Sequence, residues 1–105
     1  MYGLSEKTII AVQNVFRKYP NVEKVILYGS RAKGNFRNGS DIDLVLVGDK
    51  LTLTDQFRIE TELDDLLLPY RIDLALYHQI ENEDLVGHID RMGMVFFENV
   101  TVKGA

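Results

Sequence analysis

The stretch from Tyr28 to Val47, YGSRAKGNFRNGSDIDLVLV, decides which fold and which kind of site this chain can form. It begins at the end of one apolar run, Val25–Tyr28, and finishes in a second, Leu44–Val47. Between the runs lie Gly29-Ser30 and, ten residues further on, Asp41-Ile42-Asp43, separated by a loop that carries cations and no acid. A small-residue turn, a basic loop and paired carboxylates together predict a site for a metal ion and a nucleotide.

The two carboxylates come at the start of a predicted strand. Successive side chains of a strand point to opposite faces, so Asp41 and Asp43 share one face and Ile42 takes the other. Two adjacent carboxylates repel one another unless a cation lies between them. Hard cations such as Mg²⁺ take few protein carboxylates and complete their coordination with water and phosphate oxygens. The alternative is a solvated edge strand whose acids discourage aggregation.

Gly29 and Ser30 favour the metal–nucleotide interpretation. Glycine permits a sharp turn and a close approach by a ligand, and Ser30 can begin a short helix whose free N–H groups suit a phosphate. Arg31 and Lys33 could then contact the β- and γ-phosphates of a nucleotide. The alternative is an ordinary strand-to-helix turn in which Ser30 caps the helix and both cations are solvated.

A third acid lies further along the chain. The run Arg71–Tyr77 alternates, with Ile72 and its apolar neighbours on one face and Asp73 on the other. If this strand pairs with the strand of Asp41 and Asp43, three carboxylates converge. The alternative is an exposed strand residue paired with Arg71.

The pattern Gly29-Ser30, ten residues, Asp41-x-Asp43 and a later strand acid at Asp73 resembles the DNA polymerase β-type nucleotidyltransferase superfamily. The fuller string and the short chain resemble its minimal nucleotidyltransferase (MNT) domains, over roughly residues 5 to 98. The resemblance implies that Asp41, Asp43 and Asp73 are catalytic and hold metal ions. These would be two Mg²⁺ ions, with Mn²⁺ as the alternative metal. The resemblance also implies that Gly29, Ser30, Arg31, Lys33 and Ser40 bind the phosphates.

The resemblance further implies a reaction and a partner. The protein would transfer AMP from ATP to an acceptor hydroxyl, a tyrosine of a helical HEPN-type toxin, and would thereby act as the antitoxin. Two alternatives stay open. The acceptor could be a small molecule, as in the aminoglycoside-modifying relatives, with a homo-oligomer completing the pocket. Alternatively, the protein could neutralise its partner by contact in a hetero-oligomer, without catalysis.

Length and composition fit this interpretation. The 105 residues suit one domain, with a core expected over residues 5–98 and a frayed tail over 99–105. The absence of cysteine fits a cytoplasmic protein and excludes thiolate metal sites. No stretch is apolar enough for a membrane span. The net charge of −4 argues against extensive nucleic-acid binding.

Hydrophobic periodicity predicts alternating helices and strands, and hence an α/β (α+β) fold. By resemblance this is the nucleotidyltransferase fold, a small mixed sheet flanked by helices. Helices are expected at about 6–18, 30–34, 54–68 and 82–91, and strands at about 22–28, 42–47 and 71–77. Residues 94–97 are either a last strand or an apolar hook that docks a partner.

Several details of these elements are also predicted. Thr54 should cap the third helix, with Phe57, Ile59, Leu63, Leu66 and Leu67 on its buried side and Glu60, Glu62, Asp64 and Asp65 on a solvated face. Leu85, Val86 and Ile89 should point inward from the last helix, which Gly93 ends. His78 and His88 are expected at the surface, outside any site.

Overall fold

The computed structural model describes residues 1–37 and 39–99 of the chain. In chain order the elements are α1 (Glu6–Arg17), β1 (Lys24–Tyr28), α2 (Ser30–Lys33), β2 (Ile42–Val47), α3 (Leu53–Asp64), β3 (Ile72–Leu76), the 3₁₀ helix η1 (Tyr77–Gln79), α4 (Glu83–Met92) and β4 (Met94–Glu98). The predicted alternation of helices and strands is therefore confirmed, with most boundaries within two residues.

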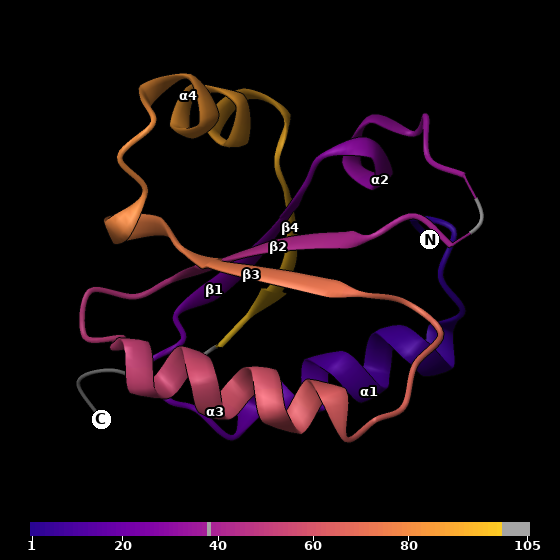
Figure 1. Cartoon of the computed structure of the whole chain (residues 1–105), viewed down its shortest axis with the longest axis horizontal. Helices are drawn as coiled ribbons and strands as arrows, with labels where there is room; N and C mark the ends of the chain where they lie inside the picture. The colour runs from indigo at the N-terminus through magenta and orange to yellow at the C-terminus, as the bar shows by residue number, and fades with distance from the viewer. Residues whose placement is uncertain (38, 100–105) are drawn as a thin grey trace.

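The strands of the described residues form one four-stranded sheet in the order β3-β2-β1-β4. β2 and β3 run parallel, whereas β1 is antiparallel to both β2 and β4. Figure 1 shows α1 and α3 side by side along one side of the sheet and α2 and α4 on the other. This small mixed sheet flanked by helices is the predicted fold class.

The main core lies between the sheet and the pair α1 and α3. Phe16 of α1, Leu44 and Leu46 of β2 and Ile59 of α3 are all fully buried in it. Because side chains alternate along a strand, burying Leu44 and Leu46 on this side turns Asp43 to the opposite face. Core packing thus sets the direction of the acid.

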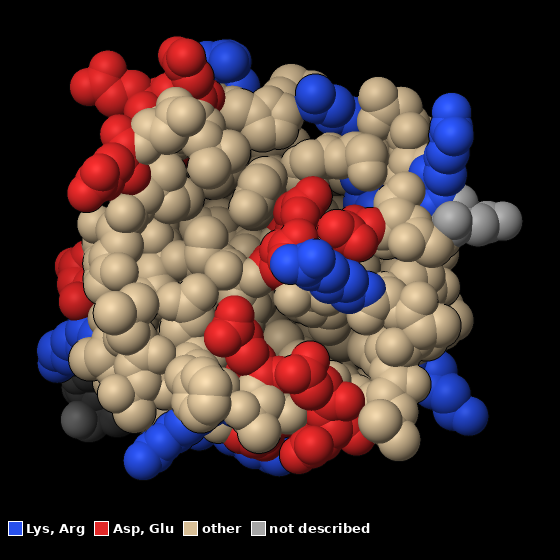
Figure 2. All heavy atoms as spheres, viewed as in Figure 1, with Lys and Arg blue, Asp and Glu red and all other residues tan. Residues whose placement is uncertain are grey.

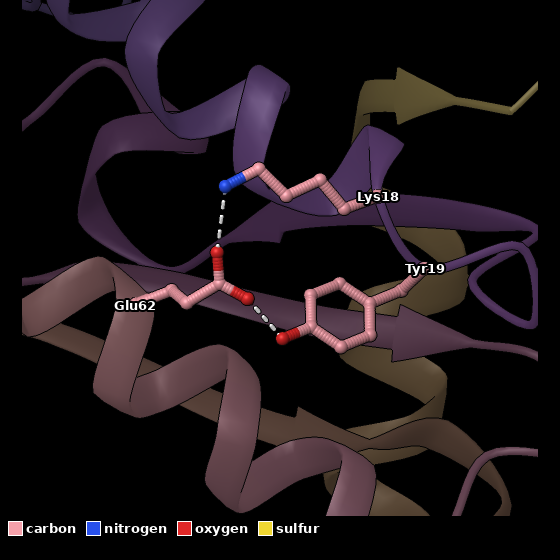
Figure 3. Close-up of polar contacts among 3 residues, drawn as sticks. All are labelled: Lys18, Tyr19 and Glu62. Atoms are coloured by element: carbon pink, nitrogen blue, oxygen red, sulfur yellow. Dashed lines mark hydrogen bonds and ion pairs between the residues drawn. The ribbon is translucent and has the colours of Figure 1, made fainter.

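A surface cluster joins the two core helices. Glu62 of α3 accepts a hydrogen bond from Lys18, at 2.8 Å, and another from the hydroxyl of Tyr19, just after α1 (Figure 3). The hydrogen bond from Lys18 is the main cause of the lowered pKa of Glu62, and the hydrogen bond to Glu62 is the main cause that raises the pKa of Tyr19 to about 12. Glu62 therefore bridges two helices, which corrects the expectation that it is simply solvated.

The start of α3 differs from the prediction. Thr52, not Thr54, is the cap: its hydroxyl accepts from the backbone N–H of Asp55 at 3.1 Å, and the Asp55 carboxylate accepts from the Thr52 N–H at 3.0 Å. This reciprocal pair satisfies two backbone donors, whereas a cap at Thr54 offers no acid three residues later. The spacing Thr52-x-x-Asp55 was a readable signal of it.

Two of the expected core residues of this helix are exposed. Ile59 and Leu63, four residues apart, define the buried line, and Phe57 lies two residues before it, on the other side of the helix. Phe57 is 69% exposed and Leu67, which follows the helix with φ +54°, is 88% exposed. Leu66 packs against the core as predicted.

The first strand begins later than predicted, and the last apolar segment is a strand. Val22 was expected in the first strand, but its N–H donates to the carbonyl of Tyr19 in a turn, so β1 begins at Lys24. Met94–Glu98 forms β4 at the sheet edge, with Phe96 and Phe97 buried in the core. Of the two interpretations of this segment, the strand is confirmed.

The last helix follows the prediction closely. Asn82 caps α4, Ile89 is buried, Leu85 and Val86 are half-buried, and Gly93 follows the final turn. His88 was expected at the surface but is half-buried, with its ring 6.5 Å from the Tyr28 ring. His78 is exposed as expected.

One backbone hydrogen bond extends the pairing of β1 with β4 beyond Glu98. The backbone N–H of Asn99 donates to the carbonyl of Glu23 at 2.9 Å. The rest of the predicted tail, residues 100–105, lies outside the described residues. In the part of the chain described here, no helix combines the length and the apolar character needed to cross a membrane.

Candidate functional site

Three polar side chains lie level with one another across three neighbouring strands. In the strand register Asp43 of β2 pairs with Asp73 of the parallel strand β3 on one side and with Tyr28 of β1 on the other. Residues in register on adjacent strands point to the same face of a sheet. The structure therefore brings Asp43 and Asp73 together, as the sequence predicted for neighbouring strands, and adds Tyr28 to the row.

The row is electrostatically unfavourable as it stands. Partial burial, followed by the negative charges of Asp73 and Asp41, raises the pKa of Asp43 above its ordinary value. Burial raises the pKa of Tyr28, and the negative charges of Asp43 and Asp73 raise it further. Each shift means that a further negative charge is disfavoured at this place, which is the condition that a bound cation would relieve.

Asp41 and Asp73 are less confined than Asp43. Asp41 is exposed and lies just before β2. Asp73 forms an ion pair with Arg71, in which Nε of Arg71 lies 3.1 Å from the carboxylate. Among the described residues, no three His, Asp or Glu side chains are close enough to hold one metal ion. Figure 2 shows a basic side chain lying across the acids at the centre of this face. The pairing with Arg71, one of the two interpretations of Asp73, is thus present.

Gly29 is required by the approach of the Asp43 carboxylate. Its φ of +77° and ψ of −154° lie in a region that is populated almost only by glycine. A Cβ at this position would come within 2.4 Å of Asp43 Oδ2. The turn from β1 into α2 therefore packs directly against the central acid of the row.

Arg31 does not lie where the sequence suggested. It is only 3% exposed, and its guanidinium donates to the carbonyls of Ser40, at 2.8 and 3.2 Å, and of Tyr2, at 2.8 Å. The same group stacks on Phe36 and Tyr70, 5.1 and 4.9 Å from the ring centres. Its donors are directed at the protein, so the expected phosphate contact is not formed by this conformation.

The remaining predicted phosphate ligands surround the same turn. Ser30 is half-buried as the first residue of α2, and Lys33 is exposed at its end. The Ser40 hydroxyl accepts from the backbone N–H of Arg37 at 2.9 Å, so it closes the loop that precedes Asp41. The structure brings Gly29 to the acid row, with Ser30 next to it in the chain, whereas the carbonyl of Ser40 contacts Arg31.

Two residues of this site were missed as site residues by sequence reasoning. Tyr28 was read only as the end of an apolar run, although its place directly before Gly29 was a usable signal. Tyr70 stacks on Arg31 and thereby joins the segment before β3 to the loop before β2. No local pattern marks Tyr70, because its partner lies far away in the sequence.

The family model for Polymerase beta, Nucleotidyltransferase, matches residues 11–101, which is most of the chain. The chain belongs to this nucleotidyltransferase family. The match spans the row of acids and the turn at Gly29 alike. Among curated proteins, none matches the sequence significantly.

Solved structures agree on the fold. A chain of a toxin–antitoxin complex with AMP-PNP has a TM-score of 0.70 and 21% identity, over 91% of this chain and 75% of that one. A chain of the MntA–HepT toxin–antitoxin gives a TM-score of 0.67 and 15% identity, over 90% and 74%. A complex of a tri-AMPylated Shewanella oneidensis HEPN toxin with an MNT antitoxin gives 0.68 and 15%, over 91% and 74%. At these identities the likeness establishes the nucleotidyltransferase fold.

Proposed function

We propose that this nucleotidyltransferase domain moves AMP from ATP to a hydroxyl group of a HEPN-type protein partner, with release of pyrophosphate, and so acts as an antitoxin. The observation that carries the proposal is the register of Asp43 and Asp73 on adjacent parallel strands, with Gly29 against the Asp43 carboxylate. Such a row combines acids for a cation and a tight turn for phosphate. Family membership supports the reaction class.

Asp41, Asp43 and Asp73 would hold divalent cations, Mg²⁺ or Mn²⁺, and two ions are expected for an in-line phosphoryl displacement. The donor set fits, since it consists of oxygen ligands, and the central carboxylate is ionised at a cost that a cation would remove. The bound cations would supply charge for the triphosphate oxygens and lower the pKa of the attacking hydroxyl. Asp41 is the exposed member of the three and lies just before β2.

The chain's own groups then have separate tasks. The acceptor oxygen attacks the α-phosphorus, its proton passes to the free carboxylate oxygen of Asp73, and the bond from the α-phosphorus to the bridging oxygen breaks. The N–H groups at Gly29 and Ser30 would bind the departing phosphates, and Lys33 would offset their charge. The buried contacts of Arg31 favour a positioning role, in which it holds the carbonyl next to Asp41.

The donor and the partner are supported by the similar structures. One is a complex with AMP-PNP, and another contains an AMPylated HEPN toxin, so ATP and a HEPN-type acceptor are the proposal for this chain. These complexes also make a hetero-oligomer the expected assembly. We further propose a cytoplasmic location, which fits both the ATP donor and the absence of cysteine.

One observation favours a second candidate function, neutralisation of the partner by contact alone. The Asp73 carboxylate is paired with Arg71, and the described residues hold no preassembled group of three metal ligands. A site in that condition could be idle. Contact inhibition would not depend on the acids at all.

The test is a pair of double variants assayed against the partner. With the double variant Asp41→Asn/Asp43→Asn, the intact mass of the partner should no longer increase by one AMP, and the toxin should stay active. Asp49→Asn with Asp65→Asn, which removes two exposed acids elsewhere, should have neither effect. A partner that is still neutralised by the first variant without any gain in mass would establish contact inhibition instead.

A further inference from the structure

A groove opens beside the acid row, between α3 and the start of β3. It has a volume of about 400 Å³, and its residues include Phe57, Glu60 and Asp64 from the helix and Tyr70 and Asp73 from the opposite wall. Figure 2 shows this face hollowed, with acidic side chains on both sides of the hollow. A volume of this size lies within the range of sites for small molecules or single side chains.

The groove lies on the side of the row away from the phosphate turn. The sheet order β3-β2-β1 puts Asp73 at one end of the row and Tyr28, followed by Gly29, at the other. In an in-line displacement the attacking and leaving oxygens are on opposite sides of the phosphorus. If the leaving phosphates lie at Gly29, the attacking hydroxyl must come from the side of Asp73, where the groove opens.

The lining selects a cationic ligand. Its lining contains three carboxylates, Glu60, Asp64 and Asp73, but a single guanidinium, Arg71, which is already paired with Asp73. A triphosphate would be repelled here, which separates the groove from the donor subsite. A lysine or arginine close to the acceptor hydroxyl would instead find two carboxylates of α3 available.

The apolar part of the lining extends beyond the groove. Phe57 is 69% exposed and also borders a second, shallow depression on the other side of α3, together with Tyr19 and Arg58. An exposed aromatic side chain surrounded by polar residues is typical of a protein contact surface. The acidic groove and the exposed Phe57 ring together offer charged and apolar contacts, the combination that a polypeptide segment can use.

We propose that the groove between α3 and β3 is the acceptor subsite, and that it admits a polypeptide segment whose hydroxyl lies beside lysine or arginine. This inference rests on the proposed function and deepens it by assigning the acceptor's class and its path. The oxygen of that hydroxyl forms the bond to the α-phosphorus, Asp73 takes the proton, and pyrophosphate leaves on the Gly29 side.

The test compares two charge-reversal variants of the full chain. Glu60→Lys with Asp64→Lys reverses the groove, and Asp65→Lys with Glu81→Lys makes the same change of net charge at exposed residues outside its lining. The probes are synthetic peptides with one tyrosine or serine flanked by arginines or by glutamates, and an aminoglycoside. Transfer from α-labelled ATP, binding of each peptide by fluorescence anisotropy, and Mg²⁺-dependent ATP binding are measured.

We expect the arginine-flanked peptides to bind and to be labelled, with both signals reduced roughly tenfold or more by the groove reversal only. ATP binding should be unchanged in both variants, which also confirms that they fold. Equal use of the glutamate-flanked peptides, or equal effects of the two variants, would overturn the acceptor groove. Labelling of the aminoglycoside alone would overturn the polypeptide assignment.

The two proposals fail in different ways. If the wild type transfers no label to any probe or to any protein of a cell extract, the proposed reaction is wrong. Peptide binding still decides the groove in that case, because the reversal must weaken binding of the arginine-flanked peptides roughly tenfold or more if this surface recognises them.

Discussion

Replacement of Arg31 should weaken the fold far more than it weakens ATP binding. The guanidinium is 3% exposed and connects three separate segments: the N-terminus through the Tyr2 carbonyl, the loop before β2 through the Ser40 carbonyl, and the segment before β3 through the Tyr70 ring. Those last two segments lead directly into Asp41 and Asp73. Arg31 therefore connects the segments that lead into the two strands carrying the acids.

The size of the effect follows from these contacts. Hydrogen bonds from a charged group contribute about 1.5–3 kcal/mol each, and each stacked ring adds about 0.5–1 kcal/mol. Because the energies of contacts that share one group are not additive, Arg31→Ala should lower the free energy of unfolding by roughly 3–5 kcal/mol. Arg31→Lys keeps the charge but loses the planar fork, so about 1–3 kcal/mol is expected.

The assay is urea unfolding, with Arg31→Lys as the main variant because Arg31→Ala removes a large part of a small domain's stability. Lys33→Ala, an exposed cation of the same helix, is the control and should change the free energy of unfolding by less than about 0.5 kcal/mol. A stable Arg31→Lys protein with strongly reduced ATP affinity would refute this reasoning and restore the phosphate contact that the sequence suggested.

Three further predictions concern the acid row and the bridge between the core helices. Gly29→Ala should lower the free energy of unfolding by roughly 1–3 kcal/mol and abolish transfer. The control Gly34→Ala also has a positive φ, +83°, but an added Cβ meets open space there, so this variant should show only the backbone strain and keep its activity. Equal losses of activity in the two variants would mean that the contact with Asp43 is not the cause. Because the folded-state pKa of Asp43 is raised above 3.8, ionising it costs stability, and this cost is absent below pH 3.8 and grows as pH rises through the raised value. Asp43→Asn should therefore have the higher melting temperature at neutral pH without metal, and only the wild type should gain from Mg²⁺; a reversed order would contradict the shift. Glu62→Gln should return the pKa of Tyr19 from about 12 toward 10.0, measured by NMR of ring-labelled tyrosine, and should lower the free energy of unfolding by at most about 1 kcal/mol because the bridge lies at the surface. The stability that this hydrogen bond adds is complete below pH 10 and disappears as pH rises through about 12. A pKa of Tyr19 near 10.0 in the wild type would show that the bridge does not form.

Local patterns predicted the elements well, because each depends on residues close together in the chain. The strand at Ile42–Val47 and the first helix, expected at about 6–18, were confirmed nearly to the residue. The errors in α3 came from giving too much weight to hydrophobic residues and too little to angular position. Phe57 lies off the line of Ile59 and Leu63, and the Asp55 carboxylate selects Thr52 as the cap.

The site could be predicted only in part, because its residues meet through long-range pairing. Asp41, Asp43 and Gly29 are marked by spacing, but the partnership of Asp73 depends on β3 lying parallel beside β2, which no local pattern encodes. The surroundings of Arg31 could not be predicted from the sequence. A basic residue in a loop suggests a phosphate ligand, and only the tertiary structure reveals the carbonyls of Ser40 and Tyr2 that its donors contact.

The most direct test of the central claim follows the label of ATP. Two samples of the protein with Mg²⁺ and an extract of its own cells receive ATP labelled at the α-phosphate or at the γ-phosphate. The account predicts label on a protein band from the α-phosphate and none from the γ-phosphate, and no label from either with Asp43→Asn. Transfer from the γ-phosphate, or undiminished α-label with Asp43→Asn, would contradict nucleotidyl transfer at this row of acids.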